Sequence, residues 1–217
     1  MNVEQARFNM IEQQIRPWDV LDTGVLQLLS VIKREDFVPP EHQALAFVDT
    51  EVPLPEGENM LAPKVEARLL QELKLQRHER VLEIGAGSGH MAALLAHKAQ
   101  QVHTVEIKPA LAALARRNLQ RAAVVNVQVH EADGVRGFSG EAPYDAIVLS
   151  GSVAEVPQQL LQQLKVGGRL VGIVGFAPVM NAVLVTRSGE SQFDTRVLFD
   201  TVAARLHGFA EPTRFRF

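Results

Sequence analysis

The stretch Val81-Leu82-Glu83-Ile84-Gly85-Ala86-Gly87-Ser88-Gly89 combines a short apolar run with three glycines in five positions. Four residues of this kind, bounded by glycine, are typical of a strand buried on both faces. Glycine adopts positive φ and lets a ligand lie against bare backbone. Residues 91–98 then have helical spacing. The stretch therefore predicts the first strand-turn-helix unit of a parallel sheet, with a ligand at the turn.

Strands and helices alternate on both sides of this unit. The apolar pattern predicts a helix over 65–73 before it, and strands over 102–107, 125–130, 144–149 and 169–174 after it. Helices are expected between them over 111–121 and 156–164. This alternation predicts a Rossmann-like α/β fold, a mostly parallel twisted sheet with helices on both faces. Residues 182–185 and 196–199 are expected to form edge strands, and edge strands on such sheets are often antiparallel.

The first 63 residues differ from the rest. Residues 3–15 have helical spacing, and Asp22 and Thr23 are candidate caps for a second helix. Prolines at 39, 40, 53, 55 and 63 predict a long loop, and we expect residues 52–63 to cover the binding site. The predicted division is an N-terminal helical and loop lobe over 1–63, the Rossmann-like domain over 64–189, and a C-terminal appendage over 190–217.

Composition excludes several classes of protein. The 217 residues carry a net charge of −3, so the basic excess typical of nucleic-acid-binding chains is absent. There is no cysteine, which excludes disulfides, thiolate zinc sites and a cysteine nucleophile. The histidines lack ligand spacing, so no metal is expected. No signal peptide and no membrane-spanning run are recognisable. We expect a cytoplasmic protein without nucleic-acid or membrane partners, with a monomer favoured.

The spacing of the glycines discriminates between nucleotide ligands. The dinucleotide pattern G-x-G-x-x-G requires glycine at position 90, where this chain has His90. The phosphate-binding G-x-x-x-x-G-K-[ST] run is absent, and Ala86 breaks the G-x-S-x-G pattern of hydrolases. His90 and His97 are expected on a solvated helix face. A nicotinamide oxidoreductase is therefore disfavoured.

Three acidic residues mark the ends of the predicted strands. Glu106 ends the second strand, where a carboxylate accepts hydrogen bonds from both hydroxyls of a ribose. Glu83 lies inside the first strand, where it would repel a pyrophosphate but tolerate a cationic amino-acid group. Its alternative role is to accept hydrogen bonds from the N–H groups of the turn. Asp133 either accepts from an adenine amine or forms the turn before Gly134.

These motifs resemble those of class I S-adenosylmethionine methyltransferases, and more specifically the protein-L-isoaspartate O-methyltransferase family. Residues 32–39, IKREDFVP, resemble the family's V-P-R-x-x-F-V-P stretch, and residues 52–57 resemble its P-L-P-I-G loop. Residues 156–164 resemble its P-x-x-L-x-x-Q-L helix. The resemblance extends from about residue 5 to residue 175.

The resemblance implies S-adenosylmethionine as the cofactor and assigns roles to residues of this chain. Glu83, Gly85 and Gly87 would line its methionine end, Glu106 would hold the ribose, and Asp133 and Gly134 would lie at the adenine. Four further residues are expected to contact the cofactor: Ala86, Ile107, Asn59 and Met60.

Departures from the family's motifs fall on the acceptor side. The family's G-x-T-I-S-x-P motif corresponds to residues 57–63, and its active-site serine corresponds to Leu61. Ile173 replaces a family proline, and the family's C-terminal F-V-P-L stretch is not recognisable. The expected reaction is methyl transfer to the carboxylate of altered aspartyl residues in damaged proteins or peptides. The alternatives are a methyltransferase with another acceptor and a cofactor-binding protein without isoaspartyl activity.

Overall fold

A seven-stranded sheet forms the centre of the molecule in a computed structural model that describes residues 2–211. Its strand order is β5-β4-β3-β6-β7-β8-β9, parallel from β5 to β7 and antiparallel thereafter. The strands are β3 (Arg80–Ile84), β4 (Gln101–Glu106), β5 (Val127–Glu131), β6 (Tyr144–Val153), β7 (Leu164–Phe176), β8 (Val179–Arg187) and β9 (Phe193–Thr201). The predicted parallel sheet is confirmed. The two later strands are antiparallel, but of these two only β9 lies at the edge, because β8 pairs with both β7 and β9.

Helices cover the two faces unequally. The helices are α1 (Val3–Met10), α2 (Thr23–Val31), α3 (Pro63–Leu73), α4 (His90–Lys98), α5 (Pro109–Arg121) and α6 (Gln158–Leu161). One apolar core packs α2–α5 against the sheet, and a second lies under α6. Alternate residues of β6 serve the two cores, Val148 the first and Leu149 the second. Helices on both faces were predicted, and the fold class is confirmed.

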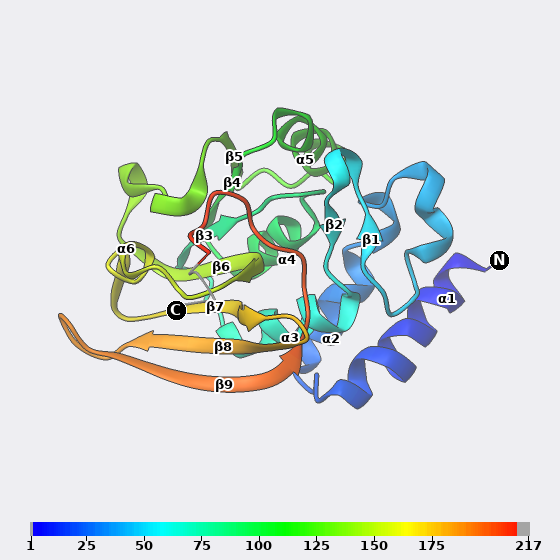
Figure 1. Cartoon of the computed structure of the whole chain (residues 1–217). Coiled ribbons are helices and arrows are strands. Elements are labelled where there is room, and N and C mark those ends of the chain that lie inside the picture. The colour runs from blue at the N-terminus through cyan, green and yellow to red at the C-terminus, as the bar shows by residue number, and fades with distance from the viewer. Residues whose placement is uncertain (1, 212–217) are drawn as a thin grey trace.

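The N-terminal lobe lies beside the sheet, in blue at the right of Figure 1. Asp22 caps α2 by accepting a hydrogen bond from the N–H of Val25 at 3.0 Å, as its sequence predicts. The helix of α1 continues as a π-helical segment, Ile11–Ile15. The loop over residues 52–63, called the Pro-rich loop below, contains a two-stranded ribbon of β1 (Val52–Pro53) and β2 (Asn59–Met60).

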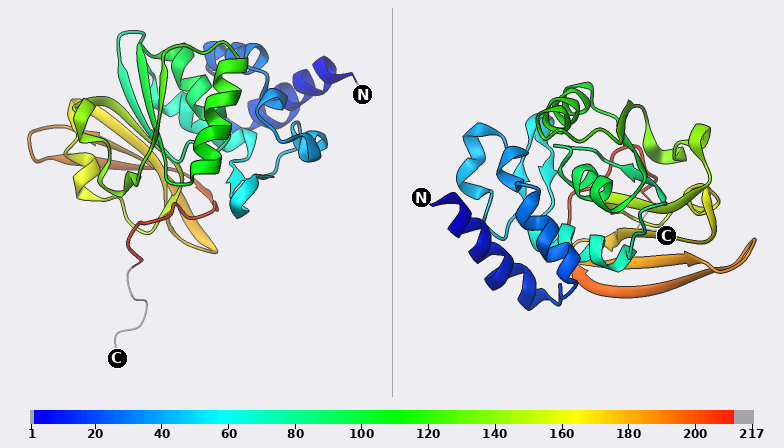
Figure 2. Two further views of the ribbon diagram at one scale, coloured as in Figure 1. Left: turned by 90° about the horizontal axis from the view of Figure 1, so that it is seen from above. Right: turned by 180° about the vertical axis from the view of Figure 1, so that it is seen from behind.

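Two boundaries differ from the expectations. The helix expected over 156–164 is shorter, because Leu164 already begins β7 by pairing with Tyr144, and the side chain of Gln163 turns to the carbonyl of Arg136. The expected border at residue 190 falls in the turn between β8 and β9, so β9 extends the sheet as part of a hairpin (Figure 2). Residues 212–217 of the expected appendage lie outside the described residues.

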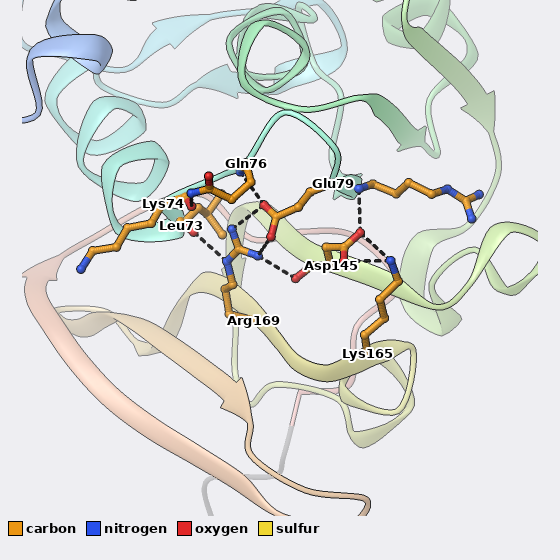
Figure 3. A network of polar contacts seen from close by, with 8 residues as sticks. Leu73, Lys74, Gln76, Glu79, Asp145, Lys165 and Arg169 are labelled. Atoms are coloured by element: carbon orange, nitrogen blue, oxygen red, sulfur yellow. Dashed lines mark hydrogen bonds and ion pairs between the residues drawn. The ribbon is translucent and has the colours of Figure 1, made fainter.

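A polar network joins the beginnings of three parallel strands (Figure 3). Arg169 of β7 donates to both carboxylate oxygens of Glu79, at 2.6 and 2.8 Å, and to the carbonyl of Leu73 at 2.6 Å. Asp145 of β6 accepts from the N–H of Arg80 and from Lys165, each at 2.8 Å. The network fixes the end of α3 against the sheet at the edge opposite the glycine turn.

Candidate active site

The glycine turn after β3 has the backbone conformation that its sequence predicts. Gly85, Gly87 and Gly89 all have positive φ, at 92°, 51° and 85°. A Cβ atom at Gly89 would lie 3.2 Å from the Cα of Ala115, so glycine allows α5 to approach the start of α4. Gly85 leaves its backbone open to a cavity between the ends of β3, β4 and β6.

Two adjoining cavities meet at this turn. The outer cavity is lined by residues from the ends of β3 and β4, from the Pro-rich loop and from the C-terminal segment: Glu58, Asn59, Ile84, Gly85, Gly87, Val105, Glu106, Ile107, Leu111, Gly134, Ser150, Arg205, Leu206, His207 and Phe209. The inner cavity lies under the Pro-rich loop and is lined by Leu54, Asn59, Met60, Leu61, Glu66, Glu83, Gly85, Ala86, Gly87, Ser88, His90, Met91 and Ser150. Asn59, Gly85, Gly87 and Ser150 border both.

Glu106 ends β4 and borders the outer cavity. One carboxylate oxygen accepts from the N–H of Gly87 at 2.9 Å, and the other accepts from the N–H of Lys108 at 3.0 Å. The side chain is thereby held at the turn, although only 5% of the residue is exposed. Each carboxylate oxygen has further lone pairs, so Glu106 can also accept from a ligand in the cavity.

Glu83 is fully buried and borders the inner cavity. It accepts hydrogen bonds from the hydroxyls of Thr104 at 2.6 Å and Ser150 at 2.7 Å. Burial raises the pKa of Glu83 to about 8, although these two hydrogen bonds oppose the rise. The alternative role expected for Glu83, accepting from the N–H groups of the turn, is wrong: the glutamate that accepts from Gly87 is Glu106.

A buried cluster of Arg34, Glu66 and His90 lies beside the inner cavity. Glu66 accepts from Arg34 and, at 2.9 Å, contacts Nδ1 of His90. Burial by itself would raise the pKa of Glu66, but the positive charges of His90 and Arg34 lower it below its usual value. His90 was expected on a solvated face; instead it is only 3% exposed and packs edge-on against Phe37. Because the lobe covers the start of α4, helix periodicity alone could not predict this burial.

Leu61 lines the inner cavity from the Pro-rich loop. Its side chain is buried, at 6% exposure, and its carbonyl accepts from Nη2 of Arg34 at 2.7 Å. The Pro-rich loop thus borders both cavities through Asn59 and the inner one through Leu54, Met60 and Leu61. Leu61 contributes an isobutyl group where a serine would contribute a hydroxyl.

The C-terminal segment, residues 204–209, forms the opposite wall of the outer cavity. A Cβ atom at Gly85 would lie 2.7 Å from Cδ2 of Leu206, so this leucine lies over the glycine turn. His207 contacts Glu58 of the Pro-rich loop at 2.7 Å, and Glu58 also accepts from Lys108. Burial alone would raise the pKa of Glu58, but Lys108 and His207 together lower it by more. The pKa of Glu58 is therefore below its usual value.

The structure brings nearly all the expected site residues together. Nine of the ten residues expected to contact the cofactor line one or both cavities, and Leu61 lines the inner one. The exception is Asp133, which is absent from both linings; its carboxylate accepts from the N–H of Val135 at 2.9 Å and so forms the turn before Gly134.

Other lining residues were not expected from the sequence. Ser150 could have been found, because it directly follows the strand predicted over 144–149, whose last residue, Leu149, pairs with Ile84 at the end of β3. Leu206, His207 and Phe209 follow the last strand and carry no motif. Glu66 and His90 are separated by 24 residues and meet only through the packing of α3 on α4.

Comparison with known proteins identifies the family. Residues 5–203 match the family described as protein-L-isoaspartate (D-aspartate) O-methyltransferase. The chain belongs to this family. A protein-L-isoaspartate O-methyltransferase of Methanoculleus marisnigri is 44% identical over 187 residues, covering 86% of this chain and 85% of that protein. One from Rhodopseudomonas palustris is 41% identical over 192 residues, covering 88% of each chain.

Solved structures of similar shape agree with the family. A Plasmodium falciparum protein described as a putative protein-L-isoaspartate O-methyltransferase in complex with S-adenosyl-L-homocysteine aligns with a TM-score of 0.81, at 20% identity, over 92% of this chain and 97% of that chain. A second protein-L-isoaspartate O-methyltransferase aligns at 0.77, with 25% identity over 91% of this chain and 65% of the other. Members of the family are S-adenosylmethionine-dependent methyltransferases, so the expected enzyme class and methyl donor are confirmed. Among residues 2–211, no helix has the length and apolar character needed to cross a bilayer.

Proposed function

We propose that this member of the protein-L-isoaspartate O-methyltransferase family methylates the side-chain carboxylate of L-isoaspartyl residues in damaged proteins, and does so weakly. The donor half of the proposal rests on the cavity at the glycine turn, with Glu106 on its rim. The qualification rests on Leu61, which places an apolar side chain over the inner cavity. The expected cytoplasmic location and monomeric state stay predictions.

The residues present fit S-adenosylmethionine. Gly85 and Gly87 line both cavities and carry no side chain, so a ligand can lie against their backbone. Glu106 can accept from ribose hydroxyls, and the apolar side chains of Ile107 and Leu111 suit a base. Glu83 in the inner cavity suits an ammonium group. The two cavities share a border, so one ligand can extend from the first into the second.

Catalysis in this proposal consists mainly of positioning. S-adenosylmethionine supplies a methyl group that is already electrophilic because it is bound to a sulfonium. A carboxylate acceptor is ionised at pH 7, so no residue has to remove a proton from it. The Pro-rich loop contributes the buried apolar side chains of Met60 and Leu61 to the inner cavity. Holding donor and acceptor in line can then supply much of the acceleration.

Replacing Glu106 by alanine should weaken binding of S-adenosylhomocysteine about 10- to 150-fold. The variant loses hydrogen bonds to a charged group, which contribute roughly 1.5–3 kcal/mol each before water compensates. It also frees the N–H of Gly87, so the turn is less ordered. Titration calorimetry of the wild type and Glu106→Ala measures this loss.

Glu131→Ala is the matched control for Glu106→Ala. Glu131 is the register partner of Glu106 on β5, but its side chain is 49% exposed and borders neither cavity. This control should bind S-adenosylhomocysteine as the wild type does. Equal affinities for Glu106→Ala and Glu131→Ala would remove the ribose role of Glu106.

Replacing Leu61 by serine should raise turnover on isoaspartyl peptides. The hydroxyl could donate to the charged substrate, an interaction of roughly 1.5–3 kcal/mol, equivalent to about 10- to 150-fold in rate. Steady-state assays on an isoaspartyl peptide and its normal aspartyl twin measure the gain. Only the isoaspartyl peptide should be methylated.

Leu61→Ala separates the hydroxyl from the loss of bulk. It opens the inner cavity as serine does but adds no donor, so it should remain as slow as the wild type. If all three proteins turn over isoaspartyl peptides equally fast, Leu61 does not limit this reaction. If none methylates the peptide while binding of S-adenosylhomocysteine persists, the acceptor is a different molecule.

A further inference from the structure

The imidazole of His90 presents one unpaired nitrogen beside the inner cavity. Its Nε2 atom is buried and has no hydrogen-bond partner among residues 2–211. His90 is one of the residues that line this cavity. A buried polar atom without a partner is costly, on the order of 1–3 kcal/mol, and in a native protein it calls for an explanation. A ligand group in the cavity would provide the missing partner.

Glu66 fixes which proton the ring carries. Its carboxylate oxygen lies 2.9 Å from Nδ1 of His90 and can only accept, so Nδ1 carries a hydrogen. Arg34 binds the same carboxylate and, through Nη2, the carbonyl of Leu61. Glu66 and Arg34 therefore hold the ring in one orientation, with Nε2 on the far side from Glu66.

Charge balance favours an anionic partner for His90. The charges of Arg34 and Glu66 cancel, so this ion pair has no net negative charge that would repel an anion at His90. Glu83, the other titratable group of the inner cavity, is largely protonated at pH 7 because burial raises its pKa to about 8. An anion at Nε2 would therefore meet little repulsion and would form a charge-assisted hydrogen bond with the ring.

The polar groups of the inner cavity can form hydrogen bonds with both ends of a free amino-acid group. Glu83 can accept from the ammonium. The carboxylate needs a donor, and the hydroxyl of Ser150 is already directed at Glu83. Glu66 would repel a carboxylate. Asn59 and Ser88 also line this cavity, but among its described lining residues only His90 has a buried nitrogen without a hydrogen-bond partner.

We propose that His90 binds the carboxylate of the methionine end of the cofactor, and that Glu66 and Arg34 act as positioning residues for its ring. The inference rests on the proposed cofactor site. It assigns affinity for the amino-acid end of the cofactor to His90, the position where this chain departs from the dinucleotide pattern. His90 then distinguishes ligands with this end from ligands without it.

Two ligands test the contact directly. S-adenosylhomocysteine carries the amino-acid end, whereas 5′-methylthioadenosine has the same nucleoside and sulfur without it. Calorimetry is compared for the wild type, His90→Asn and His90→Gln. The amide nitrogen of asparagine replaces Nδ1 and can reach Glu66 only, while that of glutamine extends to the position of Nε2. His90→Asn should lose about 10- to 100-fold in affinity for S-adenosylhomocysteine, and His90→Gln should recover most of it.

Neither variant should change the affinity for 5′-methylthioadenosine. The control is His97→Asn, on the same helix, where the histidine bonds the carbonyl of Ala93 and lines neither cavity. Equal losses for both ligands would make His90 structural, and no loss for S-adenosylhomocysteine would place its carboxylate elsewhere; either result overturns the assignment. A wild type that binds neither ligand would overturn the proposed cofactor site as well.

A measurement on the wild type does not depend on any variant folding. In ¹⁵N NMR spectra, the Nε2 signal of His90 should shift when S-adenosylhomocysteine is added at pH 7.5, because this atom then forms a hydrogen bond with the carboxylate. Adding 5′-methylthioadenosine should leave it where it is. The same response to both ligands contradicts a contact with the amino-acid end.

Discussion

In the wild type, the free energy of unfolding should decrease as the pH rises toward 8, and replacing Glu83 by glutamine should abolish this decrease. The folded protein holds a proton on Glu83 up to a pKa of about 8, while the unfolded chain releases it near 4.5. Between these values the unfolded state binds fewer protons, so the free energy of unfolding falls with increasing pH. The stabilisation is complete below about pH 4.5 and is lost as the pH passes through 8. Its size is on the order of 5 kcal/mol, since each pH unit is worth about 1.4 kcal/mol.

Urea unfolding of both proteins without ligand, at several pH values from 5 to 8.5, measures the difference. Glutamine keeps the shape of the side chain and can still bond Thr104 and Ser150. The variant should match the wild type near pH 5 and exceed it at pH 8. Glu131→Gln, at an exposed position, should follow the wild type throughout. Parallel pH profiles for wild type and Glu83→Gln would mean that Glu83 is ionised in the folded protein.

Replacing Arg169 by methionine should cost about 3 kcal/mol of stability without changing affinity for S-adenosylhomocysteine. The arginine binds Glu79 through two nitrogens and also holds carbonyls of Leu73 and Asp145. Removing it leaves a nearly buried carboxylate without its positive partner, which typically costs 3–5 kcal/mol. We expect the lower end because 13% of the Arg169 side chain is exposed. The network lies at the edge of the sheet away from the cavities.

Arg196→Met is the control for this second prediction. Arg196 also pairs with a glutamate, Glu72, but 60% of its side chain is exposed, and such a pair contributes about 0–1 kcal/mol. Arg169→Lys should fall between the two, because lysine keeps the charge but cannot bind both carboxylate oxygens in parallel. A loss of affinity in Arg169→Met under conditions where it is fully folded would show that the two edges of the sheet are coupled.

The parallel part of the sheet could be predicted from the sequence because its strands are short segments containing valine or isoleucine that alternate with helix-forming segments. Glu106 could be placed for the same reason, since it ends such a segment. The pairing of these strands also brings Gly85, Glu106 and Gly134 to one edge, which explains why motif positions suffice there.

Contacts that cross from one element to another could not be predicted. The partners of Glu83 lie 21 and 67 residues away on neighbouring strands. The burial of His90 depends on the packing of the N-terminal lobe over α4, which no local pattern encodes. The short α6 reflects a competition in which pairing of Leu164 with Tyr144 overrides helix periodicity. In each case tertiary structure decides what local propensity leaves open.

The wall that Leu206 and His207 add to the outer cavity has a kinetic consequence. A ligand held between the glycine turn and this segment would be contacted from both sides, so its residence time would also depend on residues that never contact the reacting atoms. If this segment opened slowly, release of the spent cofactor, rather than methyl transfer, would set the turnover.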